Sequence, residues 1–177
     1  MDETIVSVFG TGRARQDEPA CILAEQVGTA LAEAGFVIAN GGYRGTMYAS
    51  AKGAARTGGT VIGVTCSVFK NSRANEYITR EIGTASLNER LMKLVDLGRA
   101  YVVLPGGTGT LLELAMVWEL TNKGFLGAPR PIILAGEFWR PLVDLIATDD
   151  SACTKSIAIA EGPTQAVELI EKALRQG

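Results

Sequence analysis

The segment VVLPGGTGTLLEL, residues 102–114, joins an apolar run to a leucine-rich run through a turn of glycines and threonines. The first run is rich in valine, which favours a strand, and the second has the composition of a helix. A strand that turns directly into a helix is the repeating unit of an α/β fold. One carboxylate, Glu113, follows the glycines within this unit.

The alternation of short apolar runs and longer helical patterns extends along the chain. Six runs are predicted strands: residues 5–9, 36–39, 60–65, 100–104, 131–134 and 156–160, with a weaker candidate at 77–82. The predicted helices are residues 20–34, 45–56, 87–97, 110–123, 140–146 and 164–175. Most of the strands are apolar on both faces, which is typical of a parallel sheet covered on both sides. The sequence therefore predicts a doubly wound, Rossmann-like α/β fold with helices on both faces.

Length and composition predict one globular domain over residues 1–177, because 47% of the residues are hydrophobic and 20% are charged. The net charge of -2 and the scattered lysines and arginines argue against a nucleic acid polymer as partner. No apolar run approaches the roughly 18 residues that span a bilayer, and MDETIVSVFG lacks the pattern of a signal peptide. We therefore expect a cytoplasmic protein without a membrane partner.

The chain contains no histidine, which excludes Ser-His-Asp and Cys-His nucleophiles and imidazole acid–base chemistry. The three cysteines, Cys21, Cys66 and Cys153, are far apart and form no C-x-x-C pair. We expect them to be reduced and mostly buried, and we expect no metal site. Carboxylates, arginines, lysines, hydroxyls, backbone amides or a cofactor are left for chemistry.

Glycine-rich turns follow three of the predicted strands: GTGRAR at 10–15, NGGYRGTM at 40–47 and PGGTGT at 105–110. Ligands of such sheets bind beyond the carboxyl ends of the strands, and glycine lets the backbone approach a phosphate next to a helix N-terminus. The turns match neither a P-loop nor a clean G-x-G-x-x-G, so a nucleoside monophosphate or similar small phosphorylated molecule fits better than a triphosphate or NAD. The predicted phosphate and nucleotide contacts are Gly10, Thr11, Arg13, Gly41, Gly42, Arg44, Gly45, Gly106, Gly107, Thr108, Gly109 and Thr110.

Glu113 and Arg90 are the candidate catalytic residues, and each also has a simpler structural interpretation. Thr110-Leu111-Leu112-Glu113 fits a capping box, which by itself explains a glutamate near the start of a helix. The run LLELAMVWEL is apolar almost all round, which favours a Glu113 that faces a cleft. Ser86-Leu87-Asn88-Glu89 is a second capping box, so Glu89 is interpreted as structural. Arg90 follows it, either on a solvated helix face or as a bidentate partner for phosphate.

A family resemblance rests on several of these segments. PGGTGTLLE at 105–113 matches the PGGxGTxxE signature of the Lonely Guy family of cytokinin-activating phosphoribohydrolases, which were long mislabelled as lysine decarboxylases. VFGTGR at 8–13, GGYRGTM at 41–47, GGTVIGVT at 58–65 and NERLMKL at 88–94 resemble further motifs of that family. Asn40 stands where the family often has glycine, and Asn88 where relatives often have histidine.

The resemblance implies hydrolysis of the N-glycosidic bond of a nucleoside 5′-monophosphate to a free base and ribose 5-phosphate, without a cofactor. In the matching positions, Glu113 would stabilise the developing sugar cation or orient the attacking water, and Arg90 would bind the phosphate or sugar. It also implies a homodimer with the site near the interface, in line with the apolar helix at 110–120. Molybdenum-cofactor carrier proteins resemble the same family, so a non-catalytic binding protein is the alternative. A lysine decarboxylase is disfavoured because no lysine lies in a recognisable pyridoxal-phosphate setting.

Overall fold

A single parallel sheet of seven strands forms the centre of the computed structural model, which describes residues 3–69, 73–128 and 130–176. The strands are β1 (Ile5–Phe9), β2 (Val37–Asn40), β3 (Val61–Cys66), β4 (Arg80–Thr84), β5 (Ala100–Val103), β6 (Ile132–Ala135) and β7 (Ile157–Ala160). Their order in the sheet is β4-β3-β2-β1-β5-β6-β7, and every pairing is parallel.

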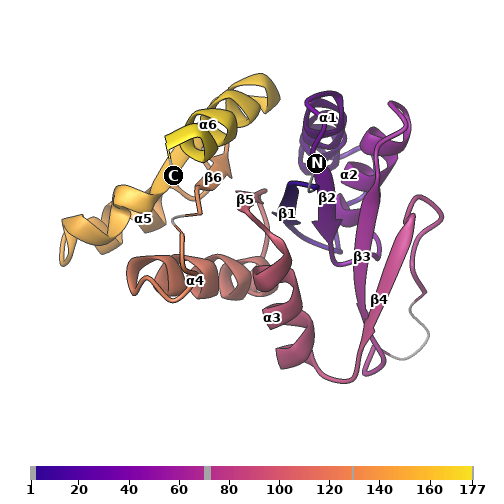
Figure 1. The fold of residues 1–177 in the computed structure, drawn as a ribbon, viewed down its shortest axis with the longest axis horizontal. Coiled ribbons are helices and arrows are strands. Elements are labelled where there is room, and N and C mark those ends of the chain that lie inside the picture. The colour runs from indigo at the N-terminus through magenta and orange to yellow at the C-terminus, as the bar shows by residue number, and fades with distance from the viewer. Residues whose placement is uncertain (1–2, 70–72, 129, 177) are drawn as a thin grey trace.

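Helices cover both faces of the sheet (Figure 1). They are α1 (Pro19–Glu33), α2 (Thr46–Ala55), α3 (Leu87–Leu97), α4 (Thr108–Asn122), α5 (Arg140–Ala147) and α6 (Pro163–Gln176), with a 3₁₀ helix, η1 (Ser151–Ser156), before β7. Residues of α1, α2 and α6 contribute to one apolar core and residues of α3 and α4 to the other. The doubly wound α/β fold is therefore confirmed. None of the helices in the described ranges is long and apolar enough to cross a membrane.

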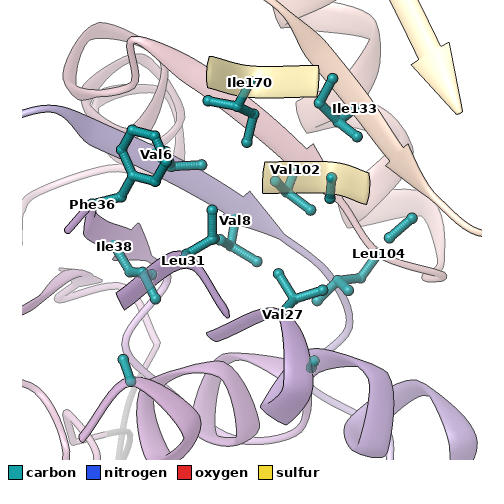
Figure 2. Packing of buried hydrophobic residues seen from close by; sticks show 14 of the residues in the cluster. Val6, Val8, Val27, Leu31, Phe36, Ile38, Val102, Leu104, Ile133 and Ile170 are labelled. Carbon is teal, nitrogen blue, oxygen red and sulfur yellow. The ribbon is translucent and has the colours of Figure 1, made fainter. Parts of the chain in front are cut away.

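Each core forms because the strands are apolar on both sides. In Figure 2, Val6, Val8 and Val102 of the central strands lie with Leu31 of α1 and Ile170 of α6. These five side chains are at most 3% exposed, and each fully buried aliphatic side chain of this size contributes about 1.5–3 kcal/mol of hydrophobic stabilisation. The packing on both faces fixes the strands, and with them the positions of the turns that follow their carboxyl ends.

The turns after β1 and β5 lie next to one another because the strand order reverses between these two strands. From β1 the chain adds β2, β3 and β4 on one side, then returns to place β5 on the other side of β1. Val8 pairs with Val102 and Phe9 with Val103, so the two strands end at the same level. A reversal of this kind opens a crevice at the carboxyl edge, which is where ligands bind in doubly wound folds.

The predicted elements agree with the structure except at three places. The weak candidate at 77–82 is a real edge strand, β4, shifted to Arg80–Thr84, and its polar sequence is explained by its exposure. The 3₁₀ helix Ser151–Ser156 was not predicted. Helix α4 starts at Thr108, two residues before the predicted start at residue 110. This last shift matters for the interpretation of Glu113.

Candidate functional site

The turns after β1 and β5 line a pocket of about 240 Å³, called here the glycine pocket. Its described lining is Gly10, Thr11, Gly12, Arg13, Gly107, Thr108, Gly109 and Thr110. The first turn of α4 has Gly107 at its N-cap and no side chain that caps it. The first amides of a helix have no intrahelical acceptor, so an uncapped first turn presents N–H groups to an anion.

Gly107 and Gly109 leave this pocket open. A β-carbon added at either position would meet no protein atom within 4 Å, so packing within the protein does not require glycine there. Neither residue has a positive φ. The absence of a side chain instead gives a ligand close access to the backbone, as a phosphate site needs.

A second pocket, of about 290 Å³ and called here the Glu113 pocket, adjoins the first. The two pockets share Gly10 and Gly109. Arg90 and Glu113 both line the second pocket, together with Tyr43, Met47, Phe69, Leu87, Leu91 and Leu112. The structure thus brings both candidate catalytic residues next to the glycine turns, although they lie on different helices.

Arg90 is buried and held in place from three sides. Its Nε donates a hydrogen bond of 2.8 Å to the carbonyl oxygen of Val64, and its guanidinium carbon lies 5.7 Å and 5.8 Å from the ring centres of Tyr43 and Phe69. A β-carbon at Gly41 would collide with Nη2 of Arg90. Gly41 is therefore required by the arginine, and the turn after β2 serves to seat this side chain.

Glu113 faces Arg90 across the pocket, with 3.8 Å between Nη1 of Arg90 and Oε1 of Glu113. The Glu113 side chain is 13% exposed. Burial raises the pKa of this carboxyl to about 7, and the nearby Arg90 charge opposes that rise without cancelling it. A carboxyl with this pKa exchanges its proton near neutral pH, as acid–base groups in active sites do.

The capping-box interpretation of Glu113 is wrong. Because α4 begins at Thr108, Thr110 lies inside the helix, and its Oγ1 is buried without a hydrogen-bond partner among the described residues. Glu113 is too far along the helix to return to the N-cap, and no described residue forms a hydrogen bond with its carboxylate. Helix capping does not account for this glutamate.

The second capping box is confirmed in its main feature. The Ser86 side chain accepts a hydrogen bond of 3.1 Å from the amide of Glu89, and the Glu89 carboxylate accepts one of 2.8 Å from the amide of Ala85. Glu89 is exposed and is not among the described lining of the Glu113 pocket. Its structural interpretation stands.

The turn after β2 is fixed by the residue that departs from the family pattern. The Asn40 side chain donates to the carbonyl oxygen of Met47 and to Oγ of Ser50, both at 3.0 Å, and accepts from the amide of Gly42 at 2.8 Å. Tyr43 is held by its hydroxyl, which accepts from the amide of Cys66 at 2.7 Å. The turn is therefore rigid where it meets the pocket.

The other predicted contacts take different places. Gly42 and Gly45 have positive φ angles of 76° and 63°, which favour glycine, and a β-carbon at Gly45 would collide with the carbonyl oxygen of Thr11. Gly106 packs against the Thr110 hydroxyl. Arg44 lines a separate, neighbouring pocket. These residues are not among the described lining of the glycine or Glu113 pockets, and their contact with a nucleotide stays a prediction.

Several pocket residues were missed by the sequence reasoning. Tyr43 lies between predicted contacts in NGGYRGTM, so its position was the available signal. Leu112 lies between Thr110 and Glu113, so the same signal applied to it, whereas Phe69 carried none because it meets the other lining residues only in the folded chain. Phe69, Leu87 and Leu112 are 38%, 45% and 44% exposed, and all three line the Glu113 pocket.

Comparison with known families matches residues 3–140 to the model of the SLOG cluster4 family, and the chain belongs to that family. An uncharacterized protein of Archaeoglobus fulgidus is 32% identical over 131 residues, which are 74% of this chain and 83% of that protein. Relatives named cytokinin riboside 5′-monophosphate phosphoribohydrolase come from Rhodococcoides fascians, Mycobacterium tuberculosis and Mycobacterium marinum. The one from Rhodococcoides fascians is 32% identical over 70% of this chain, and the one from Mycobacterium tuberculosis is 35% identical over 63%.

The match spans 64% and 60% of the lengths of those two phosphoribohydrolases. Among solved structures, the molybdenum cofactor binding protein from Rippkaea orientalis has a TM-score of 0.82 and 26% identity, over 98% of this chain and 99% of that one. The Moco carrier protein from Chlamydomonas reinhardtii has a TM-score of 0.80 at 21% identity, over 99% and 100% of the two chains, and this likeness concerns the fold alone. The relatives therefore include named enzymes and named binding proteins.

Proposed function

We propose that this protein hydrolyses the N-glycosidic bond of a nucleoside 5′-monophosphate, giving the free base and ribose 5-phosphate. The observation that carries the proposal is Glu113, a buried carboxyl with a pKa of about 7 that faces Arg90 and serves no capping role. Burying a carboxylate without hydrogen bonds is unfavourable, so a structural purpose would not explain it. Relatives of the chain are named for the same class of reaction.

The two adjoining pockets divide the substrate between them. The phosphate binds at the amides of the glycine pocket, near Thr108 and the positive end of α4, with Arg13 at the rim. The ribose and base extend into the Glu113 pocket, whose Tyr43 and Phe69 rings offer apolar surface to a base. Anchoring the phosphate fixes the sugar relative to Glu113, which is how a binding group at one end of a substrate assists reaction at the other.

The reaction breaks the bond between C1′ of the ribose and the nitrogen of the base. Positive charge develops on the sugar as this bond lengthens, and the ionised Glu113 carboxylate stabilises it or orients the attacking water. Water adds its hydroxyl to C1′, and its proton ends on the departing base. Arg90 favours the ionised form of the Glu113 carboxylate without cancelling the effect of burial on its pKa, and it contacts the sugar or phosphate side of the substrate.

The experiment is a chromatographic assay for free base and ribose 5-phosphate. AMP, other nucleoside 5′-monophosphates and an N6-prenylated AMP are each compared with the matching unphosphorylated nucleoside. The proposal predicts release from at least one monophosphate and none from its nucleoside. No release from any monophosphate by folded protein contradicts it.

A binding or carrier protein is the second candidate, and the likeness to the Rippkaea orientalis molybdenum cofactor binding protein favours it. In a carrier of a phosphorylated pterin, the glycine pocket would bind the phosphate of the ligand. The buried Glu113 carboxyl would then have no role in binding. Molybdenum content of purified protein distinguishes the candidates. Stoichiometric molybdenum together with no base release supports the carrier, and base release by molybdenum-free protein supports the enzyme.

The proposal includes a homodimer formed near the Glu113 pocket. Leu111 and Leu112 of α4 are 36% and 44% exposed, and Leu87 and Met92 of α3 are 45% and 37% exposed. One side of the apolar run of α4 therefore faces outward within the chain, which supports an interface on this side. Light scattering tests the dimer: Leu111→Lys and Leu112→Lys together are expected to give monomers.

A further inference from the structure

A third pocket, of about 430 Å³, lies beside the proposed active site and is not used by the reaction described above. Three arginines line it: Arg15 from the loop after β1, Arg44 from the turn after β2, and Arg73 from the segment before β4. Tyr43, Tyr48, Asn75 and Glu76 are also in its lining. This set is called here the arginine pocket. Tyr43 lines the Glu113 pocket as well, so the two pockets adjoin at this residue.

The charges of the arginine pocket are not balanced within the described chain. Arg44 and Arg73 have no carboxylate within 4.0 Å among the described residues, whereas Arg15 lies 3.3 Å from Asp17 and 3.5 Å from Glu18. Glu76, the single acid of the described lining, accepts a hydrogen bond of 3.2 Å from the Tyr48 hydroxyl. The lining thus carries more positive than negative charge, and guanidinium is the bidentate partner of phosphate and carboxylate groups.

The wall that carries these side chains is fixed before any ligand binds. The Asn75 side chain donates hydrogen bonds of 3.1 Å and 2.9 Å to the carbonyl oxygens of Gly42 and Tyr43. The backbone amide of Asn75 donates one of 2.8 Å to the carbonyl oxygen of Gly42. Tyr48 packs against Tyr77 with 5.2 Å between their ring centres. These contacts tie the Arg73 segment to the Arg44 turn. A preformed wall reduces the ordering cost of binding a small ion.

We propose that the arginine pocket binds a second phosphate group, distinct from the one held by the glycine pocket. The group belongs either to the same ligand, as a nucleotide with two separated phosphates, or to a separate phosphorylated effector. Arg44 is assigned to this second site rather than to the glycine pocket, because it lines only the former among the described pockets. The inference does not depend on hydrolysis, since it concerns binding at a different pocket.

The test is a titration of the ¹⁵N-labelled full chain with inorganic phosphate, followed by amide chemical shifts. Two groups of amides are expected to move with separate isotherms: Thr108 and Gly109 for the glycine pocket, and Arg44 with Asn75 and Glu76 for the arginine pocket. Arg44→Gln and Arg73→Gln should each weaken the second isotherm about tenfold and leave the first unchanged, because each removes charge-assisted hydrogen bonds to phosphate.

A matched control is Arg99→Gln, which removes an exposed arginine just before β5, at the opposite, amino edge of the sheet. It should leave both isotherms unchanged. Arg44 and Arg73 are themselves exposed, so their variants are expected to fold, and the amide spectrum reports this directly. The proposal is overturned if the chemical shifts of the arginine-pocket amides do not change while the glycine pocket saturates. It is also overturned if these shift changes persist in Arg44→Gln and Arg73→Gln.

Two further arms distinguish the sources of the phosphate. If one ligand supplies both groups, adenosine 3′,5′-bisphosphate should bind more tightly than AMP, and Arg44→Gln should abolish the difference. If a separate effector supplies the second group, phosphate should still titrate the arginine-pocket amides in the presence of saturating AMP. Either result supports a second phosphate site.

Discussion

The amino-terminal parts of α3 and α4 carry the same kind of sequence, Ser86–Glu89 and Thr110–Glu113, in which a hydroxyl residue is followed three positions later by glutamate. In α3 the pattern is used for capping: Ser86 caps the helix and the exposed Glu89 binds the amide of Ala85. In α4 it is not, because Glu113 is buried, faces Arg90 and has a pKa of about 7. One pattern thus has a structural use in one helix and a proposed chemical use in the other.

The difference comes from where each helix starts. Helix α3 starts at Leu87, so Ser86 is the N-cap and Glu89 is within reach of the helix end. The glycine turn before α4 lets the helix begin at Thr108, with Gly107 as N-cap, which carries Thr110 and Glu113 into the helix. A hydroxyl residue followed three positions later by glutamate therefore indicates a helix cap only when the residues before it prevent the helix from starting earlier.

Apart from replacement of Glu113 itself, the largest expected effect concerns Arg90. Arg90→Lys keeps the positive charge but loses the planar guanidinium that bonds Val64 and faces Glu113. We expect kcat/KM for base release to fall about 100-fold, in the range for removal of one group that stabilises a transition state. Steady-state kinetics on the best monophosphate measure this, with Arg99→Lys as the surface control. Parental activity in Arg90→Lys would remove Arg90 from the mechanism.

Loss of a helix cap lowers the free energy of unfolding, whereas Glu113→Gln should raise it at alkaline pH. The folded pKa of Glu113 is raised from 4.5 to about 7, so between these values the folded state binds more protons than the unfolded state. The free energy of unfolding of the parent therefore falls as the pH rises through this window. Glutamine does not titrate, so Glu113→Gln should be more stable than the parent by about 2–3 kcal/mol at pH 8 and similar to it near pH 4.5.

Urea unfolding at the two pH values measures this difference, and Glu89→Gln is the matched variant. Because Glu89 is exposed and bonded to a backbone amide, its replacement should lower stability slightly at neutral pH. If Glu113→Gln were the less stable variant at pH 8, the carboxylate would have a structural role after all.

The pH dependence of catalysis tests which ionisation state of Glu113 is active. If the ionised Glu113 carboxylate is the active form, kcat/KM should rise with pH and level off above about 7, falling about tenfold per pH unit below that value. A pH–rate profile of the parent between pH 5.5 and 8.5 tests this. A rate that decreases over the same range would assign Glu113 the role of an acid instead.

The smallest effects concern the two hydroxyls. Ser86→Ala removes the α3 cap and should lower the free energy of unfolding by about 1 kcal/mol. Thr110→Val removes a buried hydroxyl without a partner among the described residues, so stability should be unchanged or raised by up to about 1 kcal/mol. Thermal unfolding of both variants measures their changes in stability. Equal destabilisation of Thr110→Val and Ser86→Ala would contradict the different uses of the two hydroxyls.

The sequence predicted the parts of this molecule that depend on local pattern. Helix α3 and strand β1 agree residue for residue, because their periodicity and end signals are strong. Edge strand β4, with the polar sequence REIGT, gave only a weak signal. The start of α4 was wrong by two residues because local capping rules did not include the competing glycine turn.

The candidate site shows the same limit. Arg90 and Glu113 were identified from the family resemblance, and their 3.8 Å approach follows from the fold. Phe69 and the arginine pocket depend on contacts between segments far apart in the sequence, which no local pattern encodes. The raised pKa of Glu113 likewise follows from burial that exists only after folding.

The most direct test of the central claim is the rate of base release by the parent, Glu113→Gln and Glu89→Gln, measured side by side on the best nucleoside monophosphate. We expect Glu113→Gln to lose at least about 100-fold in kcat and Glu89→Gln to stay within about twofold of the parent. Equal losses in the two variants, or a parental rate in Glu113→Gln, would contradict the assignment of Glu113 to catalysis.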